Sequence, residues 1–400
     1  MSDGATWAIP RGFRASGITA GLKASGSLDM AVLAADQPCA AAGTFTTNRV
    51  CAAPVKWCRE VLPADDIRAI VINSGNANAA TGDQGLANAE RTAECAAALL
   101  GCQPGQVLVA STGIIGHQLP MEKIEAGIAK AVAGLSANPE AFQSAAAAMM
   151  TTDTRPKIVS KRQTIAGREV TLLGIAKGAA MIGPRMATML GFLLTDAPLW
   201  ANEIRDILAD AVDHSFNCLS VEGHASTNDT VLLLSSTAST SPILQGDDVA
   251  AFAAMVRSAC ETLARAIAAD GEGATHLITI DVEGCETFED ARTIARAVAD
   301  SPLVKTAIHG ADPNWGRVVS AAGYSGVPFE EKQLSLWINN VAVYQDGIPV
   351  PFDEAGLSQS IKSQRDVHLR LVFQSGTEAV RFWTCDLTAE YIRLNADYTT

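Results

Sequence analysis

The sequence predicts a mixed α/β (α+β) fold in which layered sheets are flanked by alanine-rich helices. Three observations lead to this class. The 400 residues are 48% apolar but only 5% aromatic, so the core material is mostly small and suits close packing of helices on sheets. Short apolar runs alternate along the chain with segments of helical periodicity. The length exceeds that of one typical domain roughly two- to threefold.

The expected elements follow these periodicities in chain order. Residues 69–72 and 106–110 are short apolar runs bounded by polar residues or glycine, which is typical of buried strands. Between them, 86–100 shows helical spacing with an alanine-rich face, and 121–135 begins after a proline, as helices often do. The same criteria predict further strands at 169–176, 230–235, 277–282 and 367–373, and further helices at 199–212, 248–268 and 287–299.

A glycine-rich stretch, Asp-Gly-Glu-Gly-Ala at 270–274, is the best internal boundary. After it the sequence contains more strand formers and less alanine. We therefore expect a main α/β domain over 1–275 and a smaller C-terminal α+β domain over 276–400. The chain has no long linker and no repeat of fixed period, so the two parts should pack against one another.

Charge and terminal sequence exclude several classes of function. The chain has 43 acidic and 30 basic residues, a formal net charge of −13, which disfavours binding to nucleic acid or anionic lipid. The N-terminus lacks a basic segment followed by an apolar one, so no secretory signal is expected. No run approaches the roughly 18 apolar residues that a membrane span requires. We expect a cytoplasmic protein that binds neither nucleic acid nor membranes.

The cysteines and histidines indicate no metal site. The nine cysteines include no Cys-x-x-Cys pair, and the six histidines are dispersed. Free thiols in a reducing compartment are the simplest interpretation. Residues 271–276 begin like a dinucleotide-binding fingerprint, but His276 stands where its third glycine belongs. We therefore expect no bound metal and no dinucleotide cofactor.

Several short segments combine small residues with hydroxyl or amide side chains. Each alone is typical of a turn or a capped helix end. Their number in one chain indicates a polar site whose glycines let backbone N–H groups approach a ligand. Composition does not name the reaction. These segments are Asn-Ser-Gly-Asn-Ala-Asn (73–78), Ser-Thr-Gly-Ile-Ile-Gly (111–116), Lys-Gly-Ala-Ala-Met (177–181), Met-Ala-Thr-Met-Leu (186–190), Ser-Thr-Asn-Asp (226–229) and Asp-Pro-Asn-Trp-Gly-Arg (312–317).

Together with further motifs, these segments form an ordered set over nearly the whole chain. The set resembles the ornithine acetyltransferases, also called glutamate N-acetyltransferases, of arginine biosynthesis. A single motif could occur by chance, whereas the ordered set is highly specific. The motifs lie at 10–13, 46–55, 73–79, 111–113, 150–154, 186–190, 226–229, 270–275, 301–307, 312–317 and 395–400.

The resemblance implies the fold of N-terminal-nucleophile aminopeptidases and ornithine acetyltransferases, and a precursor that cuts itself. The bond that would break is Ala187-Thr188, giving an α chain of 1–187 and a β chain of 188–400. A hydroxyl can attack the preceding carbonyl through a five-membered ring, and water then opens the ester. The cut frees the α-amino group of Thr188, whose reference pKa of about 7.7 to 8 lets it act as the base for its own hydroxyl.

The other site residues are transferred from the family motif by motif. Thr112 and Gly113 would form the oxyanion hole, because acyl transfer places negative charge on the acetyl oxygen. The substrate would be held by Thr152, Lys177, Thr188, Glu272, Asn395 and Thr400. A cation suits the α-carboxylate of an amino acid, and a carboxylate suits the ornithine ammonium. The last two residues can contribute only if the C-terminus folds back onto the site.

The implied activity is transfer of an acetyl group from N2-acetyl-L-ornithine to L-glutamate through an acetyl-threonine intermediate. No cofactor is required, and acetyl-CoA stays open as a second acetyl donor. Two α and two β chains are the expected assembly. Two alternatives remain: an N-terminal-nucleophile aminopeptidase or amidase, and an uncut scaffold protein.

The sequence also departs from the family pattern at several positions, some of them near the expected cut. These changes affect expectations for the cleavage rate and the substrate range. They leave the residues assigned to chemistry in place. The departures are Ala179, Ala180, Gly183, Arg185, His276 and the segment Glu-Gly-His-Ala at 222–225.

Overall fold

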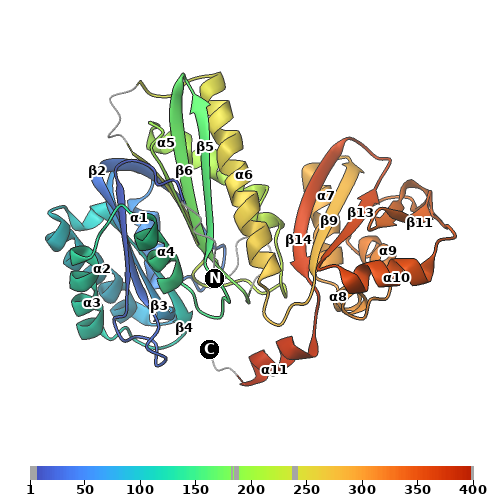
Figure 1. Cartoon of the computed structure of the whole chain (residues 1–400), viewed down its shortest axis with the longest axis horizontal. Helices are drawn as coiled ribbons and strands as arrows, with labels where there is room; N and C mark the ends of the chain where they lie inside the picture. The colour runs from blue at the N-terminus through green and yellow to red at the C-terminus, as the bar shows by residue number, and fades with distance from the viewer. Residues whose placement is uncertain (1–6, 182, 184–188, 237–241, 398–400) are drawn as a thin grey trace.

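The computed structural model describes residues 7–181, 183, 189–236 and 242–397. Its first sheet has the strand order β4-β3-β2-β8-β7-β6-β5, and β1 pairs with β2 off this path (Figure 1). Most neighbours are antiparallel, whereas β3 and β4, and β7 and β8, run parallel. The strands are β1 (Phe13–Ile18), β2 (Met30–Phe45), β3 (Ala64–Asn76), β4 (Val107–Ile114), β5 (Lys157–Ile165), β6 (Arg168–Lys177), β7 (Leu190–Thr195) and β8 (Thr230–Ser236).

The long strand β2 divides this sheet into two layers. Its first part pairs with β1 and β3, and its part from Cys39 onward pairs with β8. The register with β3 shifts between Ala34 and Cys39, where Asp36, Gln37 and Pro38 are exposed. Such an irregularity bends a strand and lets it pass from one layer to the other.

The alternation of side chains along the strands creates separate cores on the two faces of each layer. In the first layer Leu33 and Ile70 face the second layer, whereas Val32 and Val71 face outward. In the second layer Phe192 joins the core between the layers, and the neighbouring Leu193 joins the core on the outer side. A sheet that is buried on both faces therefore explains the continuous apolar runs in the sequence.

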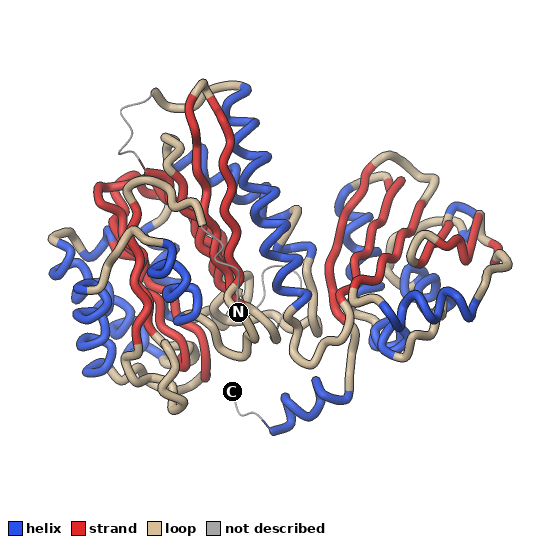
Figure 2. Tube along the Cα trace, in the orientation of Figure 1, coloured by secondary structure: helices blue, strands red, loops and turns tan. Residues whose placement is uncertain are grey.

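Helices cover the outer faces of both layers (Figure 2). The apolar sides of α2 and α3 pack on the first layer, and those of α5 and α6 pack on the second. Helix α4 packs on β1 and contributes Phe142 to the core between the layers. The helices are α1 (Ala53–Val61), α2 (Gly82–Leu100), α3 (Met121–Ala133), α4 (Pro139–Ala148), α5 (Ala201–Asp213) and α6 (Asp247–Ala269), with short 3-10 turns η1 (Pro104–Gln106) and η2 (Phe216–Cys218).

The chain then enters a second, smaller sheet with the strand order β12-β11-β10-β13-β9-β14. Figure 1 shows this sheet and its helices beside α6. Helix α11 leaves it and extends beneath the first part of the molecule. The elements are β9 (Leu277–Cys285), α7 (Phe288–Ala299), α8 (Pro302–His309), α9 (Trp315–Gly323), η3 (Glu331–Gln333), β10 (Ser335–Ile338), β11 (Val341–Gln345), β12 (Ile348–Pro349), α10 (Glu354–Ser363), β13 (Asp366–Val372), β14 (Glu378–Cys385) and α11 (Ala389–Asp397).

The predicted α/β class with layered sheets and flanking helices is confirmed. The strands and helices expected from periodicity all occur, with ends that differ by a few residues. The domain boundary at 275/276 stays a prediction, and it lies in the connection between α6 and β9. The largest element without a sequence prediction is β2, because its alanine-rich sequence has little intrinsic strand propensity.

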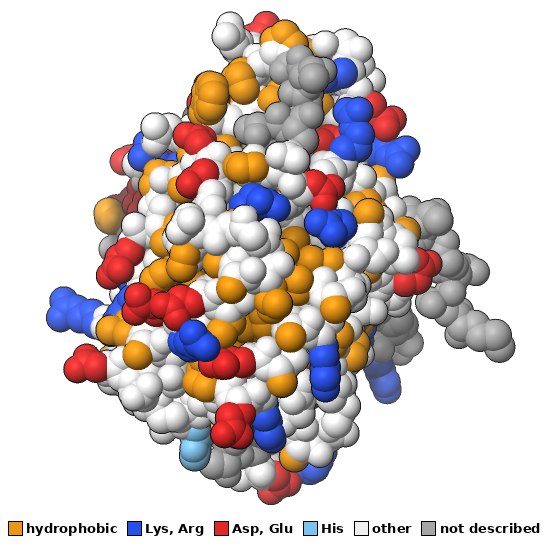
Figure 3. Space-filling model, turned by 90° about the vertical axis from the view of Figure 1, so that its left-hand side faces the viewer, with side chains coloured by type: hydrophobic (Ala, Val, Ile, Leu, Met, Phe, Trp, Pro, Cys, Tyr) orange, Lys and Arg blue, Asp and Glu red, His pale blue; other side chains and the backbone are white. Residues whose placement is uncertain are grey.

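The left-hand side of the molecule carries apolar side chains among charged ones (Figure 3). Leu86 and Leu99 of α2 are among the large apolar side chains that are exposed, at 37% and 51%. Single exposed leucines of this kind are normal for a protein surface. Within the described ranges, no helix combines the length and apolar character needed to cross a bilayer.

Candidate active site

A pocket of about 750 Å³, including open solvent at its mouth, lies where strand ends of both layers meet. The end of β4 supplies one wall, the end of β6 another, and the segment before β8 a third. Loops after α4 and α6 and the helix α11 complete it. The lining residues are Ala77, Thr112, Gly113, Ile115, Thr151, Thr152, Lys177, Ala180, Met181, Ser226, Thr227, Asn228, Glu272 and Asn395.

This pocket brings together six residues that the sequence analysis selected. They come from segments that are up to 283 positions apart in the chain, between Thr112 and Asn395. Ala187, Thr188 and Thr400 lie outside the described residues. The six are Thr112, Gly113, Thr152, Lys177, Glu272 and Asn395.

Thr112 and Lys177 form the buried polar centre of the pocket. Only 4% of Thr112 and 2% of Lys177 are exposed, and the Lys177 Nζ donates to Thr112 Oγ1 over 3.0 Å. Because the hydroxyl oxygen accepts this bond, its hydrogen is left for an acceptor in the pocket. Burial lowers the pKa of Lys177, and the nearby Asp153 carboxylate opposes this shift. Thr112 can therefore act as a donor toward a developing oxyanion.

Gly113 occupies a position where a side chain does not fit. Its φ is +131°, and a Cβ built there would lie 2.4 Å from the backbone carbon of Gly75 on β3. The close approach of these two strand ends therefore requires glycine. A bulkier residue would separate β3 from β4 at the edge of the pocket and displace Thr112.

A buried ion cluster behind the pocket was not predicted. Lys157 Nζ contacts Asp153 Oδ1 at 2.6 Å and Asp270 Oδ2 at 2.7 Å, and all three side chains are at most 5% exposed. Asp153 also accepts the Gly178 N–H over 2.6 Å. The cluster thus joins the segments that carry Thr152, Lys177 and Glu272. Lysine is typical of a surface, so no local sequence signal identifies Lys157 as buried.

Asn228 is a second functional candidate that sequence reasoning left without a role. Its Nδ2 donates to the carbonyls of Ala77 (2.6 Å) and Ser111 (2.8 Å), so it fixes the ends of β3 and β4 against the segment before β8. Its Oδ1 accepts from the Thr227 hydroxyl over 2.6 Å. The sequence signal that could have identified Asn228 is the Ser-Thr-Asn-Asp motif, because polar residues among small residues need hydrogen-bond partners when they are buried.

Glu272 and Asn395 meet in the lining of the pocket. Asn395 Nδ2 donates to Glu272 Oε2 over 2.9 Å, and the Glu272 N–H donates to the Ala179 carbonyl over 2.9 Å. The C-terminal helix α11 therefore folds back onto the site, as the role of Asn395 requires. With Lys177 and Glu272 both in its lining, the pocket has the charges to hold an amino acid that carries a side-chain ammonium.

Asp229 binds the backbone at Met189, the residue before β7. Its Oδ1 accepts the Met189 N–H over 2.9 Å, and the residue is completely buried. Burial raises the pKa of Asp229 to about 8, although the Met189 N–H and the Lys177 cation oppose this shift. The carboxyl group therefore stays protonated up to mildly alkaline pH.

Replacing Asp229 by asparagine is expected to stabilise the protein at alkaline pH. The folded-state pKa of about 8 exceeds the ordinary value of 3.8, so the contribution of Asp229 to stability is full below about pH 4 and is lost as the pH rises toward 8. Asparagine stays neutral and keeps an acceptor for Met189. Thermal unfolding should show a gain in Tm of roughly 5 °C at pH 9 and little gain at pH 4.

Asp281→Asn is the matched control, because its expected pH dependence has the opposite sign. Burial would raise the pKa of Asp281, but Arg381 and His368 lower it to about 2. Its contribution to stability is therefore present at neutral pH and is lost as the pH falls toward 2. Equal Tm changes for both variants at every pH would contradict the assignment for Asp229.

Among the described residues, no group of three or more His, Cys, Asp and Glu side chains is arranged to hold a metal ion. The polar groups of the pocket are hydroxyls, amides, one lysine and one glutamate. Such groups position a substrate and stabilise charge in acyl transfer.

Comparison with known proteins gives consistent matches over the whole chain. The sequence profile of the ArgJ family matches residues 14–400. The "Arginine biosynthesis bifunctional protein ArgJ" of Dehalococcoides mccartyi (strain CBDB1) is 46% identical over 396 residues, 98% of this chain and 96% of the relative. The protein of the same name from Parasynechococcus marenigrum (strain WH8102) is 47% identical over 404 residues, 100% of this chain and 96% of the relative.

A solved structure agrees with these sequence matches. The crystal structure of the "Arginine biosynthesis bifunctional protein argJ" from Bacillus halodurans has a chain with 35% sequence identity and a TM-score of 0.50. The match covers 52% of this chain and 98% of that chain, so the solved chain is about half as long.

Proposed function

The chain belongs to the ArgJ family of arginine-biosynthesis proteins and is an acyltransferase, and from this we propose its reaction. It transfers the acetyl group of N2-acetyl-L-ornithine to L-glutamate through an ester on Thr188. The products are L-ornithine and N-acetyl-L-glutamate. The chain is first made as a precursor, which cuts itself between Ala187 and Thr188.

The observation that carries this proposal is the gathering of six expected site residues in one pocket. They come from both sides of the proposed cut, with Thr112, Thr152 and Lys177 before it and Glu272 and Asn395 after it. Described residues that precede and follow Thr188 in the sequence lie in or next to the pocket lining. Met181 lines the pocket, and Met189 precedes Leu190, which pairs with Lys177 across β6 and β7.

Each step of the proposed mechanism uses groups of this site. The α-amino group of Thr188 takes the proton of its own hydroxyl, and the oxygen attacks the acetyl carbon. The Thr112 hydroxyl and the Gly113 N–H stabilise the negative oxygen of the tetrahedral intermediate. The bond to the ornithine nitrogen breaks, and that nitrogen takes the proton. Glutamate then attacks the ester carbon with its amine, which loses a proton to the α-amino group of Thr188, and the same groups stabilise the second intermediate. The bond to the Thr188 hydroxyl oxygen breaks, and that oxygen takes the proton back from the α-amino group.

The charged ends of the pocket would orient the substrates. Lys177 pairs with the α-carboxylate that acetylornithine and glutamate share, and Thr152, which also lines the pocket, contributes to substrate binding. Glu272, with Asn395 hydrogen-bonded to it, pairs with the ornithine ammonium. We assign Thr400 to the same site as part of this proposal. The roughly half-length solved relative is consistent with a chain that is cut near its middle.

An assay with purified protein, N2-acetyl-L-ornithine and L-glutamate tests the proposal. N-acetylglutamate and ornithine should form in equal amounts without added cofactor. A denaturing gel should show chains of 187 and 213 residues, the second beginning with Thr188. Release of free acetate or cleavage of small peptides, without transfer to glutamate, would instead identify an aminopeptidase or amidase. An uncut chain without activity would favour a scaffold.

We further propose that acetyl-CoA can serve as a second donor and that two α and two β chains assemble. The word "bifunctional" in the names of the relatives supports a second activity. Acetyl-CoA and glutamate alone should then yield N-acetylglutamate, and light scattering should give twice the mass of one precursor. N-acetylglutamate formation from acetylornithine but not from acetyl-CoA would restrict the enzyme to recycling.

A further inference from the structure

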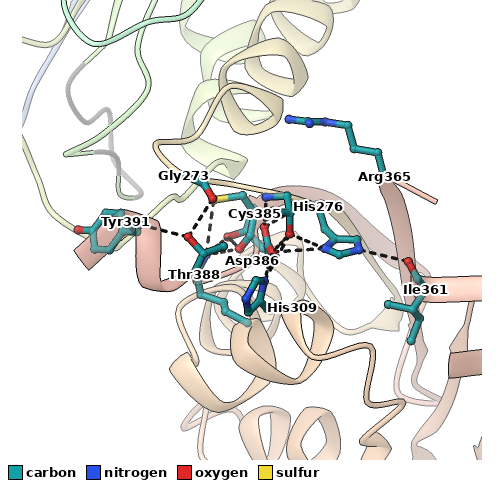
Figure 4. Close-up of polar contacts among 12 residues, drawn as sticks. Gly273, His276, His309, Ile361, Arg365, Cys385, Asp386, Thr388 and Tyr391 are labelled. Carbon is teal, nitrogen blue, oxygen red and sulfur yellow. Dashed lines mark hydrogen bonds and ion pairs between the residues drawn. The ribbon is translucent and has the colours of Figure 1, made fainter. Parts of the chain in front are cut away.

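The carboxylate of Asp386 is the centre of a polar cluster just outside the pocket (Figure 4). Asp386 follows β14, and its side chain is completely buried. Its Oδ1 accepts the backbone N–H groups of Thr275 and His276, each over 2.8 Å. Its Oδ2 accepts the Thr275 hydroxyl and faces Nδ1 of His276 at 3.3 Å and Nδ1 of His309 at 3.1 Å.

The hydrogen bonds to Asp386 favour its ionised form. Burial would raise the pKa of Asp386, but the donors on Thr275 and His276 outweigh it and hold the pKa below its ordinary value. His276 Nε2 lies 3.2 Å from the Ile361 carbonyl, which can only accept, while Nδ1 faces the Asp386 carboxylate. The ring of His276 thus links the Asp386 carboxylate to the end of α10.

The first segment that this cluster fixes carries Glu272. Asp386 holds the backbone at Thr275 and His276, only three and four residues beyond Glu272. Between them, Gly273 has a φ of +68°, and its carbonyl accepts the Thr388 hydroxyl over 2.9 Å. A Cβ on Gly273 would lie 2.6 Å from the Tyr391 backbone nitrogen, so this loop touches the start of α11.

The second segment is α11, which carries Asn395. This helix buries none of its described side chains, so a few polar contacts have to hold it. The Thr388 hydroxyl, two residues beyond Asp386, accepts the Tyr391 N–H over 3.1 Å in the first turn of the helix. One turn later, Asn395 Nδ2 contacts both the Tyr391 carbonyl (3.0 Å) and Glu272 Oε2 (2.9 Å). These contacts connect Glu272 to α11 twice. One connection runs from the neighbouring Gly273 through Thr388 to the first turn of the helix, and the other is the direct hydrogen bond from Asn395.

We propose that Asp386 is a positioning residue that sets the preference of the site for an amino acid with a side-chain ammonium. By fixing the two segments, Asp386 keeps the side chains of Glu272 and Asn395 within hydrogen-bond distance of each other. Asp386 itself is not among the residues that line the pocket. This inference rests on the proposed function, because the ammonium is that of ornithine. Loss of the anchor lets the carboxylate of Glu272 turn into solvent, where its pairing with the ammonium is weak.

Binding of L-ornithine and L-norvaline to the purified full-length protein, measured by calorimetry, tests this inference. Norvaline has the same carbon skeleton but no side-chain ammonium. The wild type should bind ornithine more tightly, and Asp386→Asn should reduce that preference about tenfold, as expected for one charge-assisted contact. Norvaline binding should stay within about twofold of the wild type, because the Lys177 end of the pocket is unchanged. Thr275→Val removes one hydroxyl contact and should give a smaller change in the same direction.

Asp281→Asn is the matched control within the same sheet. Asp281 is also a mostly buried carboxylate, paired with His368 (2.9 Å) and Arg381 (2.8 Å), and it contacts neither loop of the site. It should lose stability and keep the wild-type preference for ornithine. An unchanged preference in Asp386→Asn, or an equal loss in the control, overturns the proposal. If Asp386→Asn does not fold, an unchanged preference in Thr275→Val overturns it.

Two measurements on the wild-type protein distinguish this inference from the proposed function. Acetyl transfer by the wild type reports on the function, whereas the ratio of ornithine to norvaline binding reports on the positioning role. A wild type that binds both amino acids equally overturns the inference whatever its transferase activity. A wild type that prefers ornithine but transfers no acetyl group refutes only the function.

Discussion

Replacement of Thr188 by alanine is expected to leave one uncut chain of 400 residues and to lower acetyl transfer by on the order of 10⁴-fold or more. The mechanism needs the hydroxyl twice, to attack the Ala187 carbonyl during cleavage and to attack the acetyl carbon during transfer. Alanine has no hydroxyl, so neither attack can take place. A denaturing gel measures the first effect, and the rate of N-acetylglutamate formation measures the second.

Thr188→Ser is the matched control, because serine keeps a hydroxyl at the same position. It should still cut and should transfer acetyl groups at a measurable rate. An uncut alanine variant that transfers acetyl at the wild-type rate contradicts the acetyl-threonine mechanism. Full complementation of an arginine-requiring strain by the alanine variant would favour the scaffold alternative.

Thr112→Val is expected to have the second-largest effect, a decrease in kcat of roughly 10²- to 10³-fold with little change in KM. Valine has nearly the shape of threonine but lacks the hydroxyl that would donate to the oxyanion. It also removes the acceptor for the buried Lys177 Nζ, 3.0 Å away. Steady-state kinetics with acetylornithine, normalised to the amount of cut protein on a gel, measure this effect.

Thr112→Ser restores the hydroxyl and should recover most of the activity. A valine variant with wild-type kcat would remove Thr112 from the oxyanion hole. A variant in which KM rises while kcat is unchanged would instead assign the hydroxyl to substrate binding, since that pattern reports an interaction made equally before and in the transition state.

The local pattern of apolar residues was sufficient to predict the strands and helices that have a regular apolar run or spacing. The buried strands β3, β4 and β9 are continuous runs of branched apolar residues, and α2 and α6 show an apolar side at helical spacing. Pattern failed for β2, in which small alanines are selected by burial between two covered faces rather than by strand propensity. It also gave no sign of α11, which lies on the molecule through a few polar contacts.

The residues of the site also fall into two groups, those that sequence motifs identified and those that only the structure identified. The sequence motifs named Thr112, Gly113, Thr152, Lys177, Glu272 and Asn395, and the structure brings all six to one pocket. Lys157 and Asp386 were not identified, because their importance depends on burial beside partners that are distant in sequence. Asp270 lies 113 positions from Lys157, and His276 lies 110 positions from Asp386.

The sequence by itself determined the family and the residue types available for reaction. Both depend on the order and the covalent groups of the side chains, which can be identified directly in the sequence. Only the tertiary structure decided that Lys177 donates to Thr112, that Asn395 meets Glu272 and that Asp386 accepts the backbone N–H groups of Thr275 and His276. The physical reason is that such contacts join segments far apart in the chain, and their geometry is set by packing of the sheets rather than by local sequence.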